Sequence, residues 1–265
     1  MVRQGNSTTV TGPLPALDGT SGAVQLAGVS KVFGRGTSAV HALDHVSLEV
    51  APGEFTCLIG ASGCGKSTLL SLVAGLEQPT AGEVSAGGGR VAFLFQEPAL
   101  FPWLTALRNV AFGLEMSGMD KRAVEARATE VLRIVGLERA LHLYPYQLSG
   151  GMRHRVAVAR AWALKDASVL LMDEPFSAID AVNRMTLQKY LVDAWLKEPR
   201  TVIYVTHDID EAVYLADRIA IMTPSPGRVG EYVTVDMPRP RDRNSAQAND
   251  LRAALTDAMR RLGSH

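Results

Sequence analysis

One short stretch, Gly60-Ala61-Ser62-Gly63-Cys64-Gly65-Lys66-Ser67-Thr68, has the pattern G-x-x-x-x-G-K-[ST], which is typical of a phosphate-binding loop. Glycines let backbone N–H groups approach phosphate oxygens closely, and the N-terminus of a following helix attracts the same anion. An apolar run at 54–59 precedes the loop and predicts a buried strand, and a helical pattern at 67–74 follows it. Lys66 would reach the β- and γ-phosphates, and the Ser67 hydroxyl would ligate Mg²⁺.

The composition suits a globular protein and excludes several classes. With 265 residues and 47% hydrophobic content, the chain can form one large domain or two small ones. Its 27 basic and 27 acidic residues cancel, so nothing indicates bulk nucleic-acid binding or a polybasic membrane anchor. Cys57 and Cys64 are not spaced as a metal site and fit a reducing cytoplasm. Because no run reaches about 20 apolar residues, we expect any membrane role to come through a partner.

The pattern of elements predicts an α/β fold with a mainly parallel sheet, because apolar strands alternate with helices. Residues 1–22 mix Gly, Ser, Thr and Pro and predict a flexible tail. The block from about 98 to 164 is almost wholly helical in pattern and predicts an inserted helical subdomain. The predicted strands are 23–33, 46–50, 54–59, 83–85, 90–95, 169–172, 201–206 and 218–222. The predicted helices are 67–74, 120–135, 150–164, 184–197, 209–216 and 248–262.

Polar side chains follow two of the predicted buried strands. Asp173 and Glu174 come directly after 169–172, and His207 follows 201–206. In open α/β sheets ligands bind at the carboxyl ends of the strands, where Mg²⁺ beside Asp173 would offset the cost of burying a carboxylate. Glu174 would then orient or deprotonate a water for attack on the γ-phosphate. A carboxylate pair can also cap a helix or bind an arginine, and a single histidine is commonly structural, so these roles depend on the phosphate loop.

A second helix start with free N–H groups occurs at Leu148-Ser149-Gly150-Gly151-Met152. One nucleotide site needs only one such cradle. One interpretation is that Ser149 and Gly151 bind the γ-phosphate of a nucleotide held by another copy of the chain. The alternative is an ordinary helix start capped by Ser149.

The stretch from Gln96 to Leu104 is apolar, aromatic and interrupted by prolines, so it cannot form a regular element. Two interpretations are open on the residues alone. The stretch either packs back on the core as a loop or forms a surface that docks a partner.

Taken together, these motifs resemble the nucleotide-binding subunit of an ABC transporter over roughly residues 24–235. The signature serine before two glycines is the discriminating feature, because other P-loop ATPases lack it. The motifs stand in the family's order: the loop Gly60 to Thr68, Gln96, the signature 148–152, the strand and carboxylates 169–174, the Ser177-Ala178-Ile179-Asp180 loop and His207.

The resemblance implies a P-loop fold with a mainly parallel core, an antiparallel β subdomain and an inserted helical subdomain at about 98–164. Residues 23–240 would form the cassette, and 241–265 a helical C-terminal extension after the flexible tail 1–22. ATP and Mg²⁺ are the implied cofactors. Two cassettes would form a head-to-tail homodimer with two ATP molecules between them.

The resemblance also assigns roles to single residues. Glu174 would be the catalytic base, His207 would sense the γ-phosphate, and Phe33 would stack on adenine. Ser149 and Gly151 would act on the nucleotide of the second copy. Ser67, Gln96 and Asp173 would serve Mg²⁺. The implied phosphate contacts are Lys66 with Gly60, Ser62, Gly63, Cys64, Gly65, Ser67 and Thr68. Met152 and His154 stand where the family commonly has Gln, and we expect neither to touch a group that the chemistry needs.

Partners follow from the same resemblance. A permease in the membrane would dock near Phe101, Pro102, Trp103 and Leu104, which favours the docking interpretation of that stretch. The chain would lie on the cytoplasmic face of the inner membrane, with a periplasmic or extracellular solute-binding protein as an indirect partner and no nucleic acid. Segments such as 100–105 and 207–212 resemble the nitrate/sulfonate/taurine importers. Rival functions are a soluble ABC-type ATPase of translation or DNA repair, a P-loop kinase of small molecules, and a degenerate cassette that binds ATP structurally.

Overall fold

The computed structural model describes residues 22–263, so the predicted tail lies outside the described residues except for Gly22. Its centre is a six-stranded sheet in the order β5-β6-β7-β3-β8-β9. The first five strands in this order are parallel, and β9 is antiparallel to β8. The strands are β3 (Phe55–Gly60), β5 (Arg90–Leu94), β6 (Ala167–Asp173), β7 (Thr201–Val205), β8 (Arg218–Met222) and β9 (Val229–Thr234).

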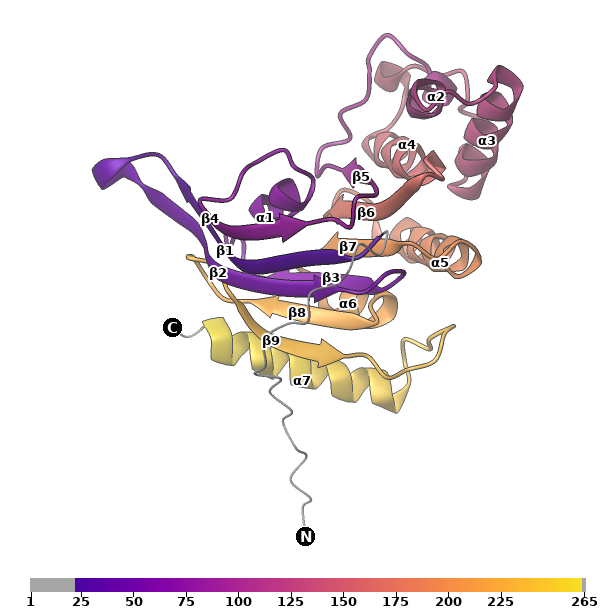
Figure 1. The fold of residues 1–265 in the computed structure, drawn as a ribbon. Helices are drawn as coiled ribbons and strands as arrows, with labels where there is room; N and C mark the ends of the chain where they lie inside the picture. The colour runs from indigo at the N-terminus through magenta and orange to yellow at the C-terminus, as the bar shows by residue number, and fades with distance from the viewer. Residues whose placement is uncertain (1–21, 264–265) are drawn as a thin grey trace.

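A second, antiparallel sheet has the order β2-β1-β4. It is formed by β1 (Val24–Phe33), β2 (Val40–Val50) and β4 (Ala81–Ser85). Helix α1 (Lys66–Val73) and this sheet cover one face of the central sheet (Figure 1). The expected antiparallel β layer and mainly parallel core are therefore confirmed.

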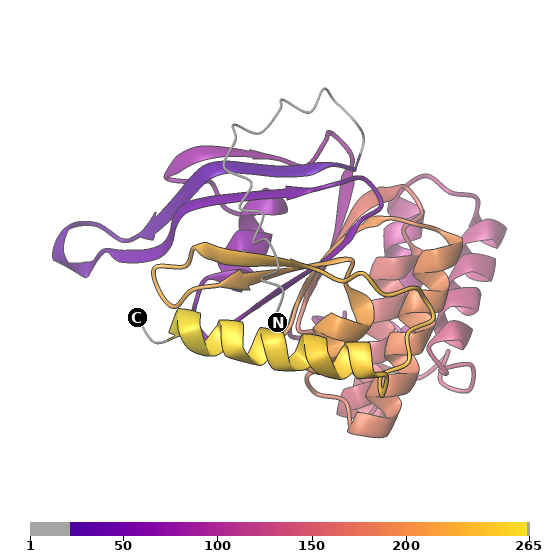
Figure 2. The ribbon, with the colours of Figure 1, turned by 90° about the horizontal axis from the view of Figure 1, so that it is seen from below.

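The remaining helices lie on the other face of the central sheet or beyond its β5 edge. They are α2 (Ala106–Met116), α3 (Lys121–Ile134), α4 (Gly150–Ala163), α5 (Ala181–Lys197), α6 (Ile209–Leu215) and α7 (Ala246–Gly263). Helices α2, α3 and α4 group together beyond β5 and β6, whereas α7 runs along β8 and β9 (Figures 1 and 2). In the part of the chain that the structure describes, no helix is long and apolar enough to span a bilayer.

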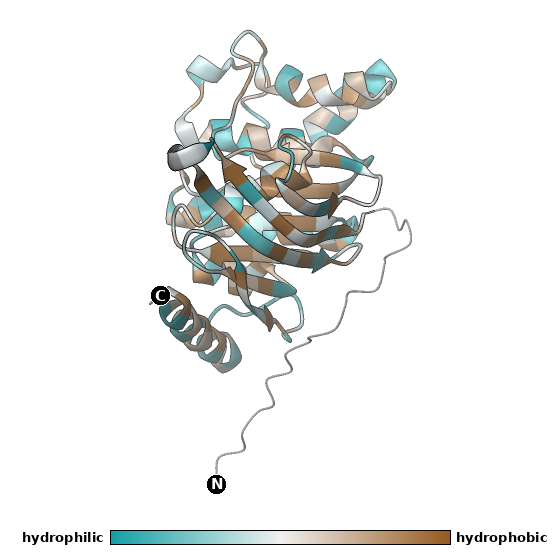
Figure 3. Ribbon diagram, turned by 60° about the vertical axis from the view of Figure 1, so that its left-hand side comes forward, coloured by the Kyte–Doolittle hydropathy of each residue, from teal (hydrophilic) through white to brown (hydrophobic). Residues whose placement is uncertain are grey.

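The alternation of strand side chains divides the core between these two layers. In β3, Phe55, Cys57 and Ile59 pack toward the helices, whereas Leu58 packs toward α1 and the antiparallel sheet. This is the period of two that a strand with both faces buried requires. Figure 3 shows hydrophobic residues along the strands between the layers. Cys57 and Cys64 are both buried and free.

The structure differs from the sequence prediction in several places. β2 begins at Val40, six residues before the predicted strand, and β9 was missed because its mixture of Gly, Glu and Tyr resembles a loop. The block 98–164 is less helical than predicted, since 98–105 and most of 135–149 are irregular. Arg127 in α3, a residue type that is mostly exposed, is buried against Glu198 and the carbonyl of Trp162. The division into domains stays a prediction.

Candidate functional site

The predicted phosphate loop (residues 60–68) connects the carboxyl end of β3 to the start of α1. Its glycines are required by close contacts. A Cβ on Gly65 would lie 2.8 Å from the carbonyl oxygen of Ala42, at a φ of +95° that side chains disfavour. A Cβ on Gly60 would lie 2.9 Å from the carbonyl oxygen of Met222. The loop therefore has this shape only with glycine at both positions.

The Lys66 side chain is held inside this loop. It is 6% exposed, and its ammonium group donates to the carbonyls of Gly60 and Ala61, at 2.9 Å each. It also lies 3.7 Å from the sulfur of Cys64. A buried cation needs such acceptors. The charge is thus concentrated at the point where the backbone N–H groups of α1 begin.

Asp173 ends β6 beside the start of α1. Burial raises the pKa of its carboxyl group, whereas a hydrogen bond from the Ser67 hydroxyl and the charge of Lys66 lower it. The described residues contain no group of three or more His, Cys, Asp or Glu side chains that could hold a metal ion. The available oxygens are therefore those of Ser67 and Asp173, and a hydroxyl with a buried carboxylate fits Mg²⁺, which prefers hard oxygen ligands.

Glu174 and His207 approach each other across two neighbouring parallel strands. The carboxylate of Glu174 lies 3.3 Å from Nδ1 of His207. Asp173 is paired with Val205 in the sheet, and the N–H of Glu174 donates to the carbonyl of Val205 at 3.0 Å. Glu174 has a φ of +45°, an uncommon value for a non-glycine residue that is frequent at functional sites. This backbone turn holds the carboxylate beside β7.

A buried network behind His207 was missed by the sequence analysis. Glu211 in α6 accepts hydrogen bonds from Thr206 at 2.7 Å, Tyr204 at 2.9 Å and Gln188 at 2.9 Å. Burial raises the pKa of Glu211, whereas the bonds from Thr206 and Tyr204 lower it. A glutamate on a short helix is normally exposed, so the sequence of α6 contains no signal that Glu211 is a buried acceptor.

The remaining predicted site residues lie apart from the loop. Ser149 caps α4 by accepting from the N–H of Met152 at 3.3 Å, and Gly151 is in the first turn of that helix. Phe33 is half-exposed at the end of β1. Within residues 22–263, no hydrogen bond or ion pair joins these residues or Gln96 to the phosphate loop. The ordinary capped helix start is thus present, whatever further role Ser149 has.

His154 contacts the backbone of the segment that contains Gln96, and the expectation that it touches no group that the chemistry needs stays a prediction. Its Nε2 lies 3.2 Å from the carbonyl oxygen of Gln96, the residue predicted to serve Mg²⁺. The sequence could not reveal this contact, because α2 and α3 separate Gln96 from α4 along the chain.

A buried side chain fixes the conformation of the aromatic stretch after Gln96. Asn109 in α2 accepts from the N–H of Phe101 at 2.8 Å and donates to the carbonyl of Leu104 at 2.9 Å. Trp103 is 70% exposed, with its ring 5.6 Å from that of Phe101, which in turn lies 4.7 Å from Phe112. The tryptophan therefore does not pack back on the core.

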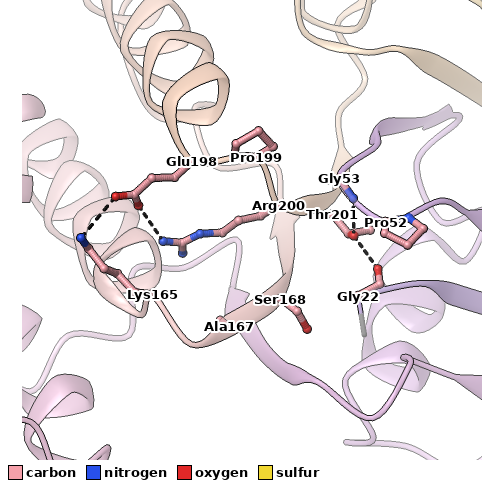
Figure 4. Close-up of a pocket in the computed structure, with 10 residues that line it drawn as sticks. All are labelled: Gly22, Pro52, Gly53, Lys165, Ala167, Ser168, Glu198, Pro199, Arg200 and Thr201. Carbon is pink, nitrogen blue, oxygen red and sulfur yellow. Dashed lines mark hydrogen bonds and ion pairs between the residues drawn. The ribbon is translucent and has the colours of Figure 1, made fainter. Parts of the chain in front are cut away.

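A cavity of about 390 Å³ lies at the opposite edge of the central sheet, near the starts of β6 and β7 (Figure 4). Glu198 pairs there with Lys165 at 3.3 Å and with Arg200 at 3.2 Å. Thr201 accepts from the N–H of Gly53 at 3.0 Å and bonds the carbonyl of Gly22. Because its charges are paired and it faces away from the carboxyl ends, this cavity is separate from the candidate nucleotide site.

Comparison with known proteins agrees with this geometry. The family described as ABC transporter matches residues 43–177. An uncharacterized ABC transporter ATP-binding protein of Methanocaldococcus jannaschii is 45% identical over 239 residues, 88% of this chain and 89% of that protein. An aliphatic sulfonates import ATP-binding protein of Bacillus licheniformis is 45% identical over 229 residues, 84% of this chain and 88% of that protein.

A solved structure extends the likeness to three dimensions. It is a dimeric ATP-binding cassette in a post-hydrolysis state bound to ADP and Pi. Its TM-score is 0.74 at 33% sequence identity, with 81% of this chain and all of that chain covered. With these relatives and the phosphate loop, carboxylate pair and histidine at adjacent strand ends, the chain belongs to the ATP-binding proteins of the ABC transporter family.

Proposed function

We propose that this chain hydrolyses ATP as a subunit of an importer for small, often anionic solutes, acting as a head-to-tail dimer beneath a separate permease. One observation carries the proposal. The phosphate loop, Asp173 with Glu174, and His207 follow β3, β6 and β7, which are neighbours in the sheet. A carboxylate that can act as a base and an imidazole thus stand at the same edge as the phosphate cradle, which fits a site for ATP hydrolysis.

The residues divide the reaction between them. Lys66 and the N–H groups at the start of α1 would hold the phosphates and offset their charge. Glu174 would accept a proton from the attacking water, and the neighbouring His207 would contact the γ-phosphate. Ser67 and Asp173, together with Gln96, would hold Mg²⁺. When bound, the ion neutralises charge on the phosphate oxygens.

A second copy completes the site in this proposal. The first turn of α4 presents free N–H groups beside Ser149 and Gly151, but neither residue bonds the phosphate loop of its own chain. Both would therefore act on the nucleotide of the partner, while Phe33 stacks on adenine within the chain. The dimeric arrangement of the ADP-bound cassette supports this proposal.

The exposed aromatic stretch is the proposed docking site for the permease. Phe101, Pro102, Trp103 and Leu104 form an irregular surface that Asn109 holds in place. Large exposed aromatic side chains are typical anchors of protein interfaces. This would place the chain on the cytoplasmic face of the membrane, with a solute-binding protein as an indirect partner and no role for nucleic acid. The relatives named for aliphatic sulfonates import support sulfonates or similar anions as the solute class.

Replacing the proposed base tests the function. Glu174→Gln should bind ATP but hydrolyse it about 100-fold or more slowly, because a general base contributes that much or more. It should also accumulate an ATP-bound dimer, measured by size-exclusion chromatography with and without ATP. Glu138→Gln, at an exposed position in another part of the chain, is the matched control and should behave as wild type. Near-normal turnover in Glu174→Gln would remove Glu174 from this role, and transfer of phosphate to a metabolite would favour a kinase.

A further inference from the structure

Two side chains of α4 hold the backbone that follows β5. Arg160 donates to the carbonyls of Pro98 and Ala99, at 2.9 Å each. Nε2 of His154 lies 3.2 Å from the carbonyl oxygen of Gln96. The two side chains are six positions apart on the helix, a rise of about 9 Å, which matches about three extended residues. The segment therefore runs along α4 and is attached to it near both of its ends.

The imidazole of His154 also reaches the start of its own helix. Its Nδ1 lies 3.1 Å from the carbonyl oxygen of Gly150, which stands between Ser149 and Gly151. Both neighbours of the ring are carbonyl oxygens and can only accept. A neutral imidazole donates from one nitrogen at a time, so its two bonds compete, whereas a protonated ring donates to both. A neutral ring therefore bonds one of the two carbonyls at a time, so the bond that it makes to Gln96 depends on its contact with the turn that begins α4.

The two connected segments serve different nucleotides under the proposed function. Gln96 faces the chain's own Mg²⁺ and ATP, and the turn with Ser149 faces the ATP of the second copy. A displacement of one carbonyl therefore alters the bond that the ring makes to the other. Coupling between sites requires such an element, whose arrangement both ligands bias.

We propose that His154 is a positioning residue that couples the two nucleotide sites of the dimer by linking the Gln96 backbone to the Ser149 turn. The inference rests on the proposed function, since it needs an ATP-hydrolysing dimer. It also explains why a glutamine is suitable at this position. The carboxamide of glutamine carries two N–H donors on one nitrogen and can bond carbonyl oxygens as the imidazole does.

The test compares His154→Ala with His154→Gln in the full chain. ATP hydrolysis is measured against ATP concentration, with binding of a fluorescent ATP analogue to the monomer and thermal unfolding measured in parallel. With two coupled sites the wild-type Hill coefficient should approach about two, and in His154→Ala it should fall toward about one. His154→Gln should restore the wild-type coefficient, because it again supplies a donor. His142→Gln, a histidine exposed elsewhere in the chain, is the matched control.

The outcomes separate this inference from the proposed function. A wild-type Hill coefficient in His154→Ala would overturn the coupling role, even if its maximal rate were reduced. Loss of cooperativity in both His154→Ala and His154→Gln, with unchanged unfolding temperatures, would also overturn it, because donation to the carbonyls would then not be the cause. A wild-type chain without ATPase activity would instead refute the proposed function itself.

Discussion

Glu211→Ala should lower the free energy of unfolding more than any change to an exposed carboxylate. Glu211 is 5% exposed and is the common acceptor for the hydroxyls of Tyr204 and Thr206 and the amide of Gln188. Tyr204 is itself fully buried. Alanine would leave these donors without a partner in a space that water does not readily reach. Thr206 directly precedes His207, so the same change should also loosen the backbone that presents the histidine.

The magnitude follows from the three bonds and one desolvated charge. A hydrogen bond to a charged group contributes about 1.5–3 kcal/mol. Removing the carboxylate also recovers several kcal/mol of its desolvation cost, which offsets part of the loss. Each neutral donor left without a partner costs about 1–3 kcal/mol, so the net destabilisation after this offset should be about 3 kcal/mol. For a chain of this size it corresponds to a fall in Tm of about 10 °C.

Equilibrium unfolding in urea provides the measurement. The fluorescence of Trp195, which is buried against Phe55 at a ring distance of 5.9 Å, should report loss of the core. Asp210→Ala is the matched control, because Asp210 is the preceding residue of the same helix but 62% exposed and paired with Arg252. A surface pair of this kind contributes at most about 1 kcal/mol.

Equal unfolding midpoints for Glu211→Ala and Asp210→Ala would refute the reasoning. That result would mean that the three donors find other acceptors when the carboxylate is removed. A large loss of stability with a changed urea dependence would instead indicate that the variant alters the compactness of one of the two states.

Three further predictions concern the pH dependence, the dimer and the partner surface. Burial raises the pKa of Glu211 above its ordinary 4.5. Between that value and the raised pKa, the folded state retains a proton that the unfolded state releases. The stability that this proton contributes is therefore present below pH 4.5 and is lost as the pH rises through the folded pKa. Urea unfolding from pH 4 to 8 should therefore show a decline in wild type relative to Glu211→Gln, and parallel profiles would contradict it. Ser149→Arg should abolish cooperative ATP turnover yet leave ATP binding to the monomer intact; failure of monomer binding would show that Ser149 acts within its own chain. Trp103→Ala should weaken binding to the permease by about 2 kcal/mol, as truncation of a buried aromatic anchor does, while its unfolding free energy stays within about 0.5 kcal/mol of wild type. Unchanged affinity in a pull-down titration would place the interface elsewhere.

Local sequence was sufficient wherever a signal is contained in a few neighbouring residues. The strand before the phosphate loop, the helix after it, the Ser149 cap of α4 and the helix that begins near Asp120 are all present in the structure. These features depend on hydrogen bonds and dihedral preferences within one or two turns of chain. Local sequence was insufficient where distant elements decided the result. β9 forms because β8 offers it an edge, and Arg127 is buried because Glu198 and the end of α4 surround it.

The sequence by itself determined the chemistry that this protein carries. The order of the phosphate loop, the Asp173–Glu174 pair and His207 identifies an ATP site, because each motif can be recognised from a few neighbouring residues. Only the tertiary structure decided which side chains meet. The strand order places Glu174 beside His207, and the packing of α4 places His154 on Gln96. These contacts join residues 33 and 58 positions apart in the sequence, so they depend on sheet register and helix packing, which local patterns do not encode.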